Sequence, residues 1–213
     1  PLVTGEVSKK NAYIYSISLG LFGYLILYTQ STTLAANIAL SANIFYSFIY
    51  TLILKPRTNQ NIVIGGAAGA APVLIGWSAT GAELEIGSWL LFLLVFLWTP
   101  AHFWALSLEN IDDYKDADFP MLPTQESKKR TAIFIGVYSC ATVITSILLA
   151  PILQLGITYL VLALLFGVYL MYKSYGLYVD KVKPISYFIF SNTYLAVIFL
   201  SMVGDIFITL GSI

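Results

Sequence analysis

The sequence predicts an all-α membrane protein, a bundle of about seven transmembrane helices, and three observations support this prediction. Of the 213 residues, 58% are hydrophobic and only 10% are charged, whereas a soluble domain usually carries about 25% charged residues. The apolar residues form runs near the length of about 20 residues that a helix needs to cross the hydrocarbon core. The basic residues alternate with these runs so that they all fall on one side of the membrane.

The apolar runs are separated by short linkers, so neighbouring helices should pack antiparallel in one bundle. We find no change in composition that would divide the chain, and residues 1–213 therefore form a single predicted domain. The third run is rich in glycine from Gly65 to Gly76, which suits close helix packing or leaves room for a bulky ligand. Pro72 and Pro100 should each kink a helix. The predicted spans are Ala12–Thr29, Leu34–Leu54, Ile62–Ala79, Ser88–Leu108, Thr131–Ala150, Leu153–Tyr172 and Ile185–Ile208.

The distribution of charge predicts the orientation of this bundle. With seven spans, all 11 Lys and Arg residues lie on one side, and the other side carries only Glu83, Glu85 and Asp205. Because basic linkers stay in the cytoplasm, the side with Lys and Arg is the predicted cytoplasmic side. The net charge of zero speaks against a nucleic-acid-binding protein.

The stretch from Trp98 to Pro123 changes from an apolar run to the densest acidic cluster of the chain. If the helix continues to Asp116, then His102, Glu109, Asp113 and Asp116 lie within roughly 60° on one face. Clustered carboxylates repel one another unless cations neutralise them. Their hard oxygen ligands suit Mg²⁺, which is usually held together with substrate phosphates. The alternative is an ordinary acidic loop at the water boundary.

A second polar segment, Lys55–Asn61, lies on the same predicted side. Lys55 and Arg57 either orient the bundle or clamp phosphate oxygens, for which the bidentate guanidinium is well suited. Thr58 and Asn61 could donate further hydrogen bonds to a ligand or cap the following helix.

His102, the only histidine, lies inside a predicted span. Ionisable residues there are rare and usually functional, although a lone buried histidine is often a hydrogen-bonded structural residue. The 13 Phe, 15 Tyr and 4 Trp residues suit interfacial belts or the stabilisation of a cation in a buried cavity. Carboxylates, basic residues and an aromatic chamber together favour the removal of diphosphate from a lipid, which leaves a shielded allylic cation.

Four motifs, in this order, resemble those of the haem O synthases (protohaem IX farnesyltransferases), a branch of the UbiA-type intramembrane prenyltransferases. The resemblance spans nearly the whole chain. The motifs are Lys55-Pro-Arg-Thr-x-x-Asn-Ile, Ile64-Gly-Gly-Ala-Ala-Gly-Ala-Ala-Pro-x-Leu-Ile-Gly-Trp77, Trp98-Thr-Pro-Ala-His-Phe-Trp-Ala-Leu106 and Asp112-Asp-Tyr-Lys-x-Ala-Asp-x-Pro-Met-Leu-Pro123.

This resemblance implies a nine-helix fold that transfers a farnesyl group from farnesyl diphosphate to the vinyl group of haem B, giving haem O. It implies Mg²⁺ as cofactor, a place in the inner (plasma) membrane with the acidic loop in the cytoplasm, and haem A synthase or terminal oxidase assembly as partners. The family's first acidic motif precedes an Arg-Pro-Leu stretch, and this chain starts at Pro1-Leu2. We therefore expect the 213 residues to lack the first two helices and that motif, and to be inactive alone.

The resemblance also implies roles for individual residues. Asp118 is less certain, since family members vary there, and Ala101 stands where many relatives have a second proline. The implied catalytic residues are Asp113, Asp116 and His102; the implied substrate-binding residues are Lys55, Arg57, Asn61, Tyr114 and Trp104; the implied metal ligands are Asp112, Asp113 and Asp116.

Three alternatives remain at this stage. A related enzyme could prenylate a quinone or chlorophyll precursor. A small transporter would need ionisable residues deep in several spans, and only His102 is clearly placed that way. A haem-carrying protein would bind haem through His102 without turnover.

Overall fold

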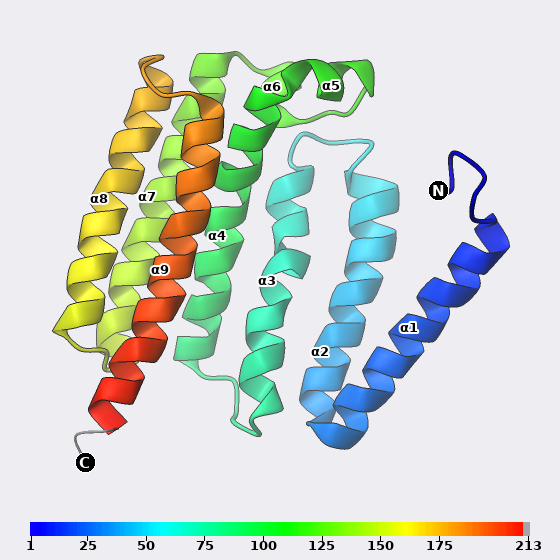
Figure 1. Ribbon diagram of the computed structural model, residues 1–213, viewed down its shortest axis with the longest axis horizontal. Helices are drawn as coiled ribbons and strands as arrows, with labels where there is room; N and C mark the ends of the chain where they lie inside the picture. The colour runs from blue at the N-terminus through cyan, green and yellow to red at the C-terminus, as the bar shows by residue number, and fades with distance from the viewer. Residues whose placement is uncertain (211–213) are drawn as a thin grey trace.

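The structure is a computed structural model that describes residues 1–210, and in this range helices and short connections make up the whole fold (Figure 1). The elements are α1 (Lys9–Gln30), α2 (Thr33–Ile44), a π-helical continuation η1 (Phe45–Leu54), α3 (Asn61–Ala79), α4 (Ile86–Glu109), α5 (Ile111–Asp116), α6 (Leu122–Gln125), α7 (Lys128–Ile152), α8 (Ile157–Tyr178) and α9 (Pro184–Leu210).

Among the described residues, seven helical stretches are long and apolar enough to cross a membrane, with α2 and η1 counted as one. The predicted all-α fold and the seven spans are therefore confirmed. The predicted sixth span, Leu153–Tyr172, is displaced, because α8 runs from Ile157 to Tyr178. Gln154 adopts a positive φ of 53° in the turn between the end of α7 at Ile152 and the start of α8.

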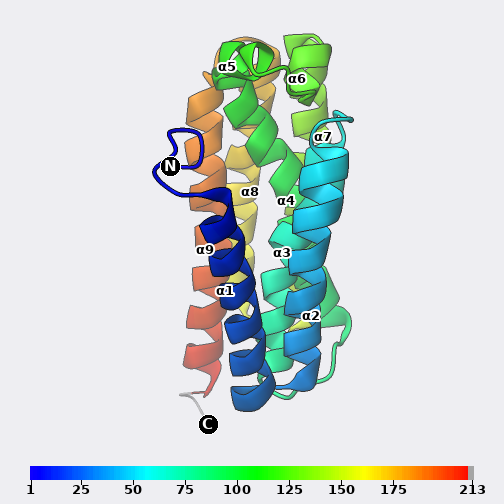
Figure 2. The same cartoon turned by 90° about the vertical axis from the view of Figure 1, so that its right-hand side faces the viewer.

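The central helix of the bundle is α4, which packs against α3, α7 and α9. The short helices α5 and α6 lie across one end of the bundle, while α1 stands at its edge and packs chiefly against α2 (Figures 1 and 2). Helix α1 buries none of its residues. The core is therefore concentrated around α4, α7, α8 and α9, and the acidic end of α4 is fixed to the best-packed part of the molecule.

Buried hydroxyl groups join α7 to α8 and α9 within the membrane-spanning region. The hydroxyl oxygens of Tyr187 and Ser139 lie 2.6 Å apart. One heptad later on both helices, the hydroxyl of Tyr194 donates to Ser146 at 2.7 Å. The hydroxyl of Tyr159 donates to the carbonyl oxygen of Ser146 at 2.7 Å. Because the hydrocarbon core offers no water, these internal partners are what makes polar side chains tolerable there.

The glycines of α3 allow its neighbours to approach closely at one position and leave open space at another. A methyl group at Gly65 would collide with the ring of Tyr50, so this glycine makes room for η1. No atom lies within 4 Å of the corresponding position at Gly69. Gly69 and Pro72 instead line an open groove of about 360 Å³ between α2 and α3. Both expected uses of small residues, close packing and free space, therefore occur on the same helix.

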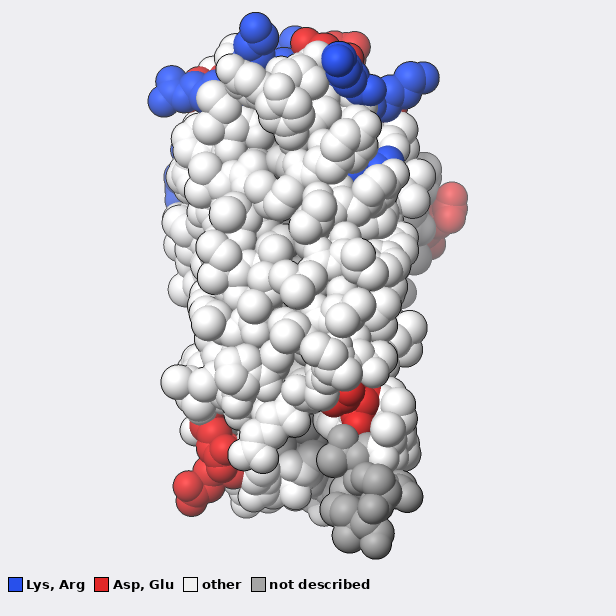
Figure 3. All heavy atoms as spheres, turned by 90° about the vertical axis from the view of Figure 1, so that its left-hand side faces the viewer, with Lys and Arg blue, Asp and Glu red and all other residues white. Residues whose placement is uncertain are grey.

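Charged side chains lie at the two ends of the bundle, and a broad uncharged band separates them (Figure 3). The Lys and Arg side chains visible on this face gather at the end that carries α5 and α6, together with some acidic residues (Figure 3). The opposite end shows acidic residues alone on this face. This is the asymmetry that the sequence predicts for a bundle with seven spans.

Candidate functional site

Helix α4 ends at Glu109, so the condition that one helix continues to Asp116 is not met. Asn110 leaves the helical region with φ of −109° and ψ of 36°. Its side-chain amide donates to the carbonyl oxygen of Leu106 at 3.0 Å. The backbone N–H of Asn110 donates to the same carbonyl oxygen at 3.1 Å, so Leu106 accepts two hydrogen bonds where α4 ends. His102 and the aspartates are therefore on separate helices and do not share one face.

Glu109 belongs to the packing of α9 and not to the acidic cluster. Its Oε2 accepts a hydrogen bond of 3.1 Å from the backbone N–H of Ile185, in the first turn of α9. A negative charge is favourable at that position, because the first N–H groups of a helix carry partial positive charge. The end of α4, where α5 begins, is thereby tied to the start of α9.

The three aspartates of the implied metal site occupy one side of α5. With about 100° between successive residues, Asp112, Asp113 and Asp116 lie within an arc of roughly 100°. Tyr114 is on the opposite side, and Lys115 borders the arc, roughly 60° from Asp112. All three carboxylates are exposed. Within residues 1–210, no three His, Cys, Asp or Glu side chains come close enough together to hold a metal ion. Exposed carboxylates still suit Mg²⁺, which usually needs only one or two of them besides substrate phosphates.

The second polar segment lies directly beside the acidic one, although the two are far apart in the sequence. The buried side-chain amide of Asn61 donates to the carbonyl oxygen of Pro120 at 3.3 Å and to that of Lys55 at 3.5 Å. The ammonium group of Lys55 lies 5.0 Å from the centre of the Phe119 ring. The structure thus brings the Lys55–Asn61 segment and the chain after α5 into direct contact.

Two hollows lie where these segments meet, and Tyr114 and Phe119 form a wall common to both. The Lys55 hollow has a volume of about 210 Å³. The Arg57 hollow has a volume of about 430 Å³. The Lys55 hollow is lined by Tyr50, Lys55, Asn61, Ile62, Phe103, Tyr114, Phe119 and Met121, and the Arg57 hollow by Pro56, Arg57, Tyr114, Lys115, Asp118, Phe119, Pro120, Thr124 and Gln125.

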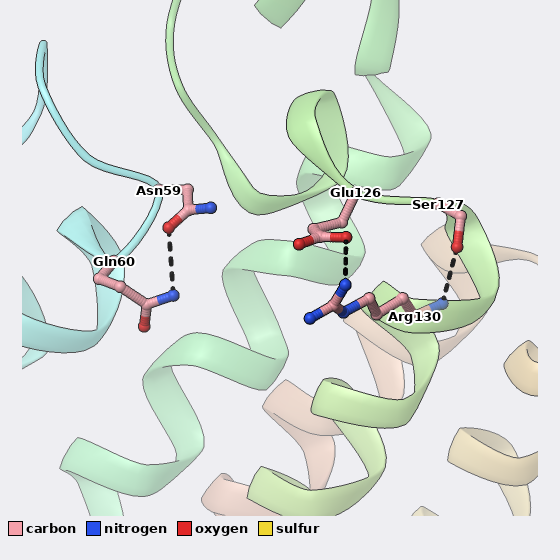
Figure 4. A network of polar contacts seen from close by, with 5 residues as sticks. All are labelled: Asn59, Gln60, Glu126, Ser127 and Arg130. Atoms are coloured by element: carbon pink, nitrogen blue, oxygen red, sulfur yellow. Dashed lines mark hydrogen bonds and ion pairs between the residues drawn. The ribbon is translucent and has the colours of Figure 1, made fainter.

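The junction of α6 and α7 adjoins this region (Figure 4). Glu126 and Arg130 form an ion pair at 3.3 Å, and the Ser127 hydroxyl accepts a hydrogen bond from the backbone N–H of Arg130 (Figure 4). In the loop before α3, the Gln60 amide donates to Asn59 (Figure 4). Each of these contacts lies within its own segment, at the end of a helix or in a loop.

His102 lies between α4 and α9 and lines neither hollow. Its ring stacks between Trp98 and Phe188, with ring centres 4.2 and 4.3 Å away. Its Nδ1 lies 2.7 Å from the Ser191 hydroxyl oxygen, which itself donates to the carbonyl oxygen of Phe188. Since that hydroxyl has only one proton to give, both bonds form together when Nδ1 carries the proton. This geometry agrees with the structural alternative for His102.

Trp104 faces α7 and is only 1% exposed. Its indole packs edge-on against Phe134 and Tyr138, and its Nε1 has no hydrogen-bond partner among the described residues. Neither hollow is lined by this side chain. The structure therefore separates Trp104 from the other implied substrate-binding residues, Lys55, Arg57, Asn61 and Tyr114, which line the hollows.

Several residues of the hollows were not singled out from the sequence, among them Tyr50 and Phe119. Lys115 was counted only among the basic residues that orient the bundle. It could have been noticed, because it lies between Tyr114 and Asp116, two of the implied site residues. No pattern in the sequence shows that Phe119 lies beside Lys55, since this contact depends on how two loops fold against each other.

The chain matches the model of the UbiA prenyltransferase family over residues 1–209. The chain belongs to this family. Curated relatives support the assignment: it is 42% identical over 207 residues to a "Protoheme IX farnesyltransferase" of Thermus thermophilus and 40% identical to one of Clavibacter sepedonicus. A protein of the same name from Trichormus variabilis is 41% identical over 209 residues.

These alignments cover nearly the whole chain but only part of each relative. They include 95–96% of this chain, and 34% of the Thermus, 68% of the Clavibacter and 66% of the Trichormus protein. The chain therefore spans about a third of the first of these relatives and about two thirds of the others.

A solved structure shares the fold of this family member. It is described as "Structural and mechanistic insights into the biosynthesis of Digeranylgeranylglyceryl phosphate synthase in membranes", with a TM-score of 0.77 at 20% identity. The likeness covers 96% of this chain and 72% of that one. Together with the seven apolar helices, it identifies the chain as a multi-pass membrane protein of the UbiA fold.

Proposed function

We propose that this chain is part of a prenyltransferase that moves a farnesyl group from farnesyl diphosphate to the vinyl group of haem B, producing haem O. The observation that carries the proposal is the meeting of two loops at the charged end of the bundle, where Lys55, Arg57, Asn61 and Tyr114 line adjoining hollows beside the aspartates of α5. The names of the curated relatives support haem as the acceptor.

The Lys55 hollow suits the diphosphate end of the donor. It combines one ammonium group and one buried amide with the rings of Tyr50, Phe103 and Phe119. Lys55 balances the charge that develops on the leaving diphosphate, and the aromatic faces stabilise a cation on the adjacent allylic carbon. Because these rings also exclude water, the cation survives long enough to meet the acceptor.

The reaction then balances as follows. The bond between the first farnesyl carbon and the diphosphate oxygen breaks, and the electron pair leaves with the diphosphate. The electrons of the haem vinyl group form the new carbon–carbon bond. Water adds to the resulting cationic carbon beside the porphyrin and loses a proton, which gives the hydroxyethylfarnesyl group.

The side chains of Asp112, Asp113 and Asp116 would hold Mg²⁺ on their side of α5. When bound, this ion supplies positive charge that makes diphosphate a better leaving group. His102 we assign to positioning, since its bond to Ser191 fixes α4 on α9. Trp104 likewise supports the site by packing α4 on α7.

By the positive-inside rule the site faces the cytoplasm, and the bundle belongs in the plasma membrane. The expected partners are those that consume haem O: haem A synthase and terminal oxidase assembly.

The test is an assay of the complete gene product in membranes with Mg²⁺ and farnesyl diphosphate, offering haem B and 4-hydroxybenzoate in parallel. We expect haem O from the first acceptor and no prenylated benzoate from the second. Prenylated benzoate alone would overturn the choice of acceptor. Transport of a solute that needs neither Mg²⁺ nor prenyl donor, without any prenyl transfer, would overturn the reaction class.

A further inference from the structure

We propose that the Arg57 hollow binds the carboxylate groups of the acceptor, the two propionates of haem B, while the diphosphate occupies the Lys55 hollow. This inference rests on the proposed function and divides its two anionic substrates between two neighbouring sites. The reaction needs such a division, because each substrate carries an anionic group and the two carbons that react must lie between them.

The Arg57 hollow presents two basic side chains that form no ion pair within residues 1–210. Arg57 comes from the loop before α3, and Lys115 comes from α5. None of Asp112, Asp113 and Asp116 lines this hollow, although Lys115 is only roughly 60° from Asp112 around α5. A guanidinium group with a free bidentate edge and an ammonium group make a suitable site for carboxylates.

The place of this hollow also suits a planar aromatic acceptor. Its wall against the Lys55 hollow consists of Tyr114 and Phe119, whose rings offer faces for stacking. The propionates of haem B lie on one edge of the porphyrin, and its vinyl groups lie on the opposite half of the ring. If Arg57 and Lys115 hold the propionates, the vinyl groups point away from the charged end of the bundle. They then lie beside Tyr114 and Phe119, the wall between the Arg57 hollow and the Lys55 hollow that holds the donor.

The Arg57 hollow also contains one carboxylate that works against this ligand. Asp118 lines it, is exposed, and makes no ion pair with either basic residue. Its φ is 52°, a conformation that asparagine adopts more easily than most residues. Asp118→Asn thus removes the repelling charge and keeps the backbone, which gives the inference a variant that is expected to bind haem more tightly.

The experiment measures haem B binding by absorbance, without farnesyl diphosphate, in nanodiscs that hold the complete gene product in phosphatidylcholine. Arg57→Gln and Lys115→Gln are each expected to weaken binding about three- to tenfold, as for charged hydrogen bonds near a surface. Lys129→Gln is the matched control, an exposed lysine at the same end that lines neither hollow, and should bind like wild type.

Haem B dimethyl ester separates the carboxylates from the rest of the acceptor. Wild type should prefer the diacid, the variant with both Arg57→Gln and Lys115→Gln should lose that preference, and Asp118→Asn should increase it. The inference is overturned if wild type and the double variant prefer the diacid over the ester equally. It is also overturned if the main effect of Arg57→Gln is a rise in KM for farnesyl diphosphate.

Phosphatidylglycerol nanodiscs distinguish a lipid headgroup as the source of the anion. If this lipid displaces the diacid and its ester equally, the hollow is a headgroup site and the inference fails. A wild-type protein that binds haem without discriminating diacid from ester refutes the inference alone. A protein that binds no haem at all refutes the proposed function as well.

Discussion

Replacing Asn61 should show whether the contact between the two loops is what builds the site. The side-chain amide donates to the carbonyl oxygens of Pro120 and Lys55, and the side chain is only 1% exposed. Two such hydrogen bonds are worth about 1–3 kcal/mol together, and the buried carbonyls would lose their partner in Asn61→Ala. Because 1.4 kcal/mol is about tenfold in an equilibrium, the docked arrangement of the loops becomes markedly less populated.

Asn61→Asp is the sharper variant, because it keeps the shape of the side chain and changes only its chemistry. A buried carboxylate would face two carbonyl oxygens and could donate to them only after taking up a proton. We expect Asn61→Asp to destabilise the protein at least as much as Asn61→Ala, and both variants to lose haem O formation. The assays are the free energy of unfolding in mixed detergent and the yield of haem O. An Asp variant as stable and active as wild type would refute this reasoning.

Three further results are expected. Ser139 donates to a carbonyl of its own helix, so Ser139→Ala leaves the buried hydroxyl of Tyr187 without its partner. This variant should lower the free energy of unfolding by about 1–3 kcal/mol, and Tyr187→Phe should lower it by about 0.6 kcal/mol. Equal losses in the two variants would contradict this order. Glu109→Ala should cost about 1 kcal/mol by the same measurement, and Glu109→Gln, which can still accept the hydrogen bond, less. The hydrogen bond and the charge of Lys128 lower the pKa of Asp180. The pair therefore stabilises the folded state at pH values above the ordinary Asp pKa, and this stabilisation is lost as the pH falls through the lowered pKa. Lys128→Gln should raise the pKa of Asp180 in an NMR titration.

The spans could be predicted from the sequence because the membrane imposes a length and a polarity on each one. The prediction was wrong where hydropathy carries no information about the backbone. Gln154 and Gly156 lie between two long apolar runs and were read as part of one span, yet Gln154 takes a positive φ in a turn. Similarly, the periodicity around His102 continues towards Asp116, and only the backbone of Asn110, which leaves the helical region, shows where α4 ends.

The functional site could be predicted only in part. The residue types and the resemblance drew attention to the Lys55–Asn61 segment, which the structure brings into contact with the chain after α5. They gave no information on which way side chains point. The aspartates of α5 share the charged end of the bundle with Lys55 and Arg57 but line neither hollow, and their role as metal ligands stays a prediction.

The role of His102 shows the same limit. A functional role was favoured because ionisable residues inside membrane spans are usually functional. The surroundings of the His102 ring, however, are formed in part by α9, almost 90 residues later in the chain. There Ser191 and Phe188 enclose the ring and hold Nδ1. Contacts of such long range follow from the packing of helices and are not encoded in any local pattern.

The central claim is that the exposed aspartates of α5 are required for prenyl transfer, and one comparison tests it most directly. Haem O formation is measured in membranes containing the complete gene product as wild type, Asp113→Asn or Asp180→Asn, with equal amounts of inserted protein. Both aspartates are exposed, but Asp180 pairs with Lys128 and lines neither hollow. We expect Asp113→Asn to abolish haem O formation and Asp180→Asn to retain it. Undiminished turnover in Asp113→Asn, or an equal loss in both variants, would contradict the claim.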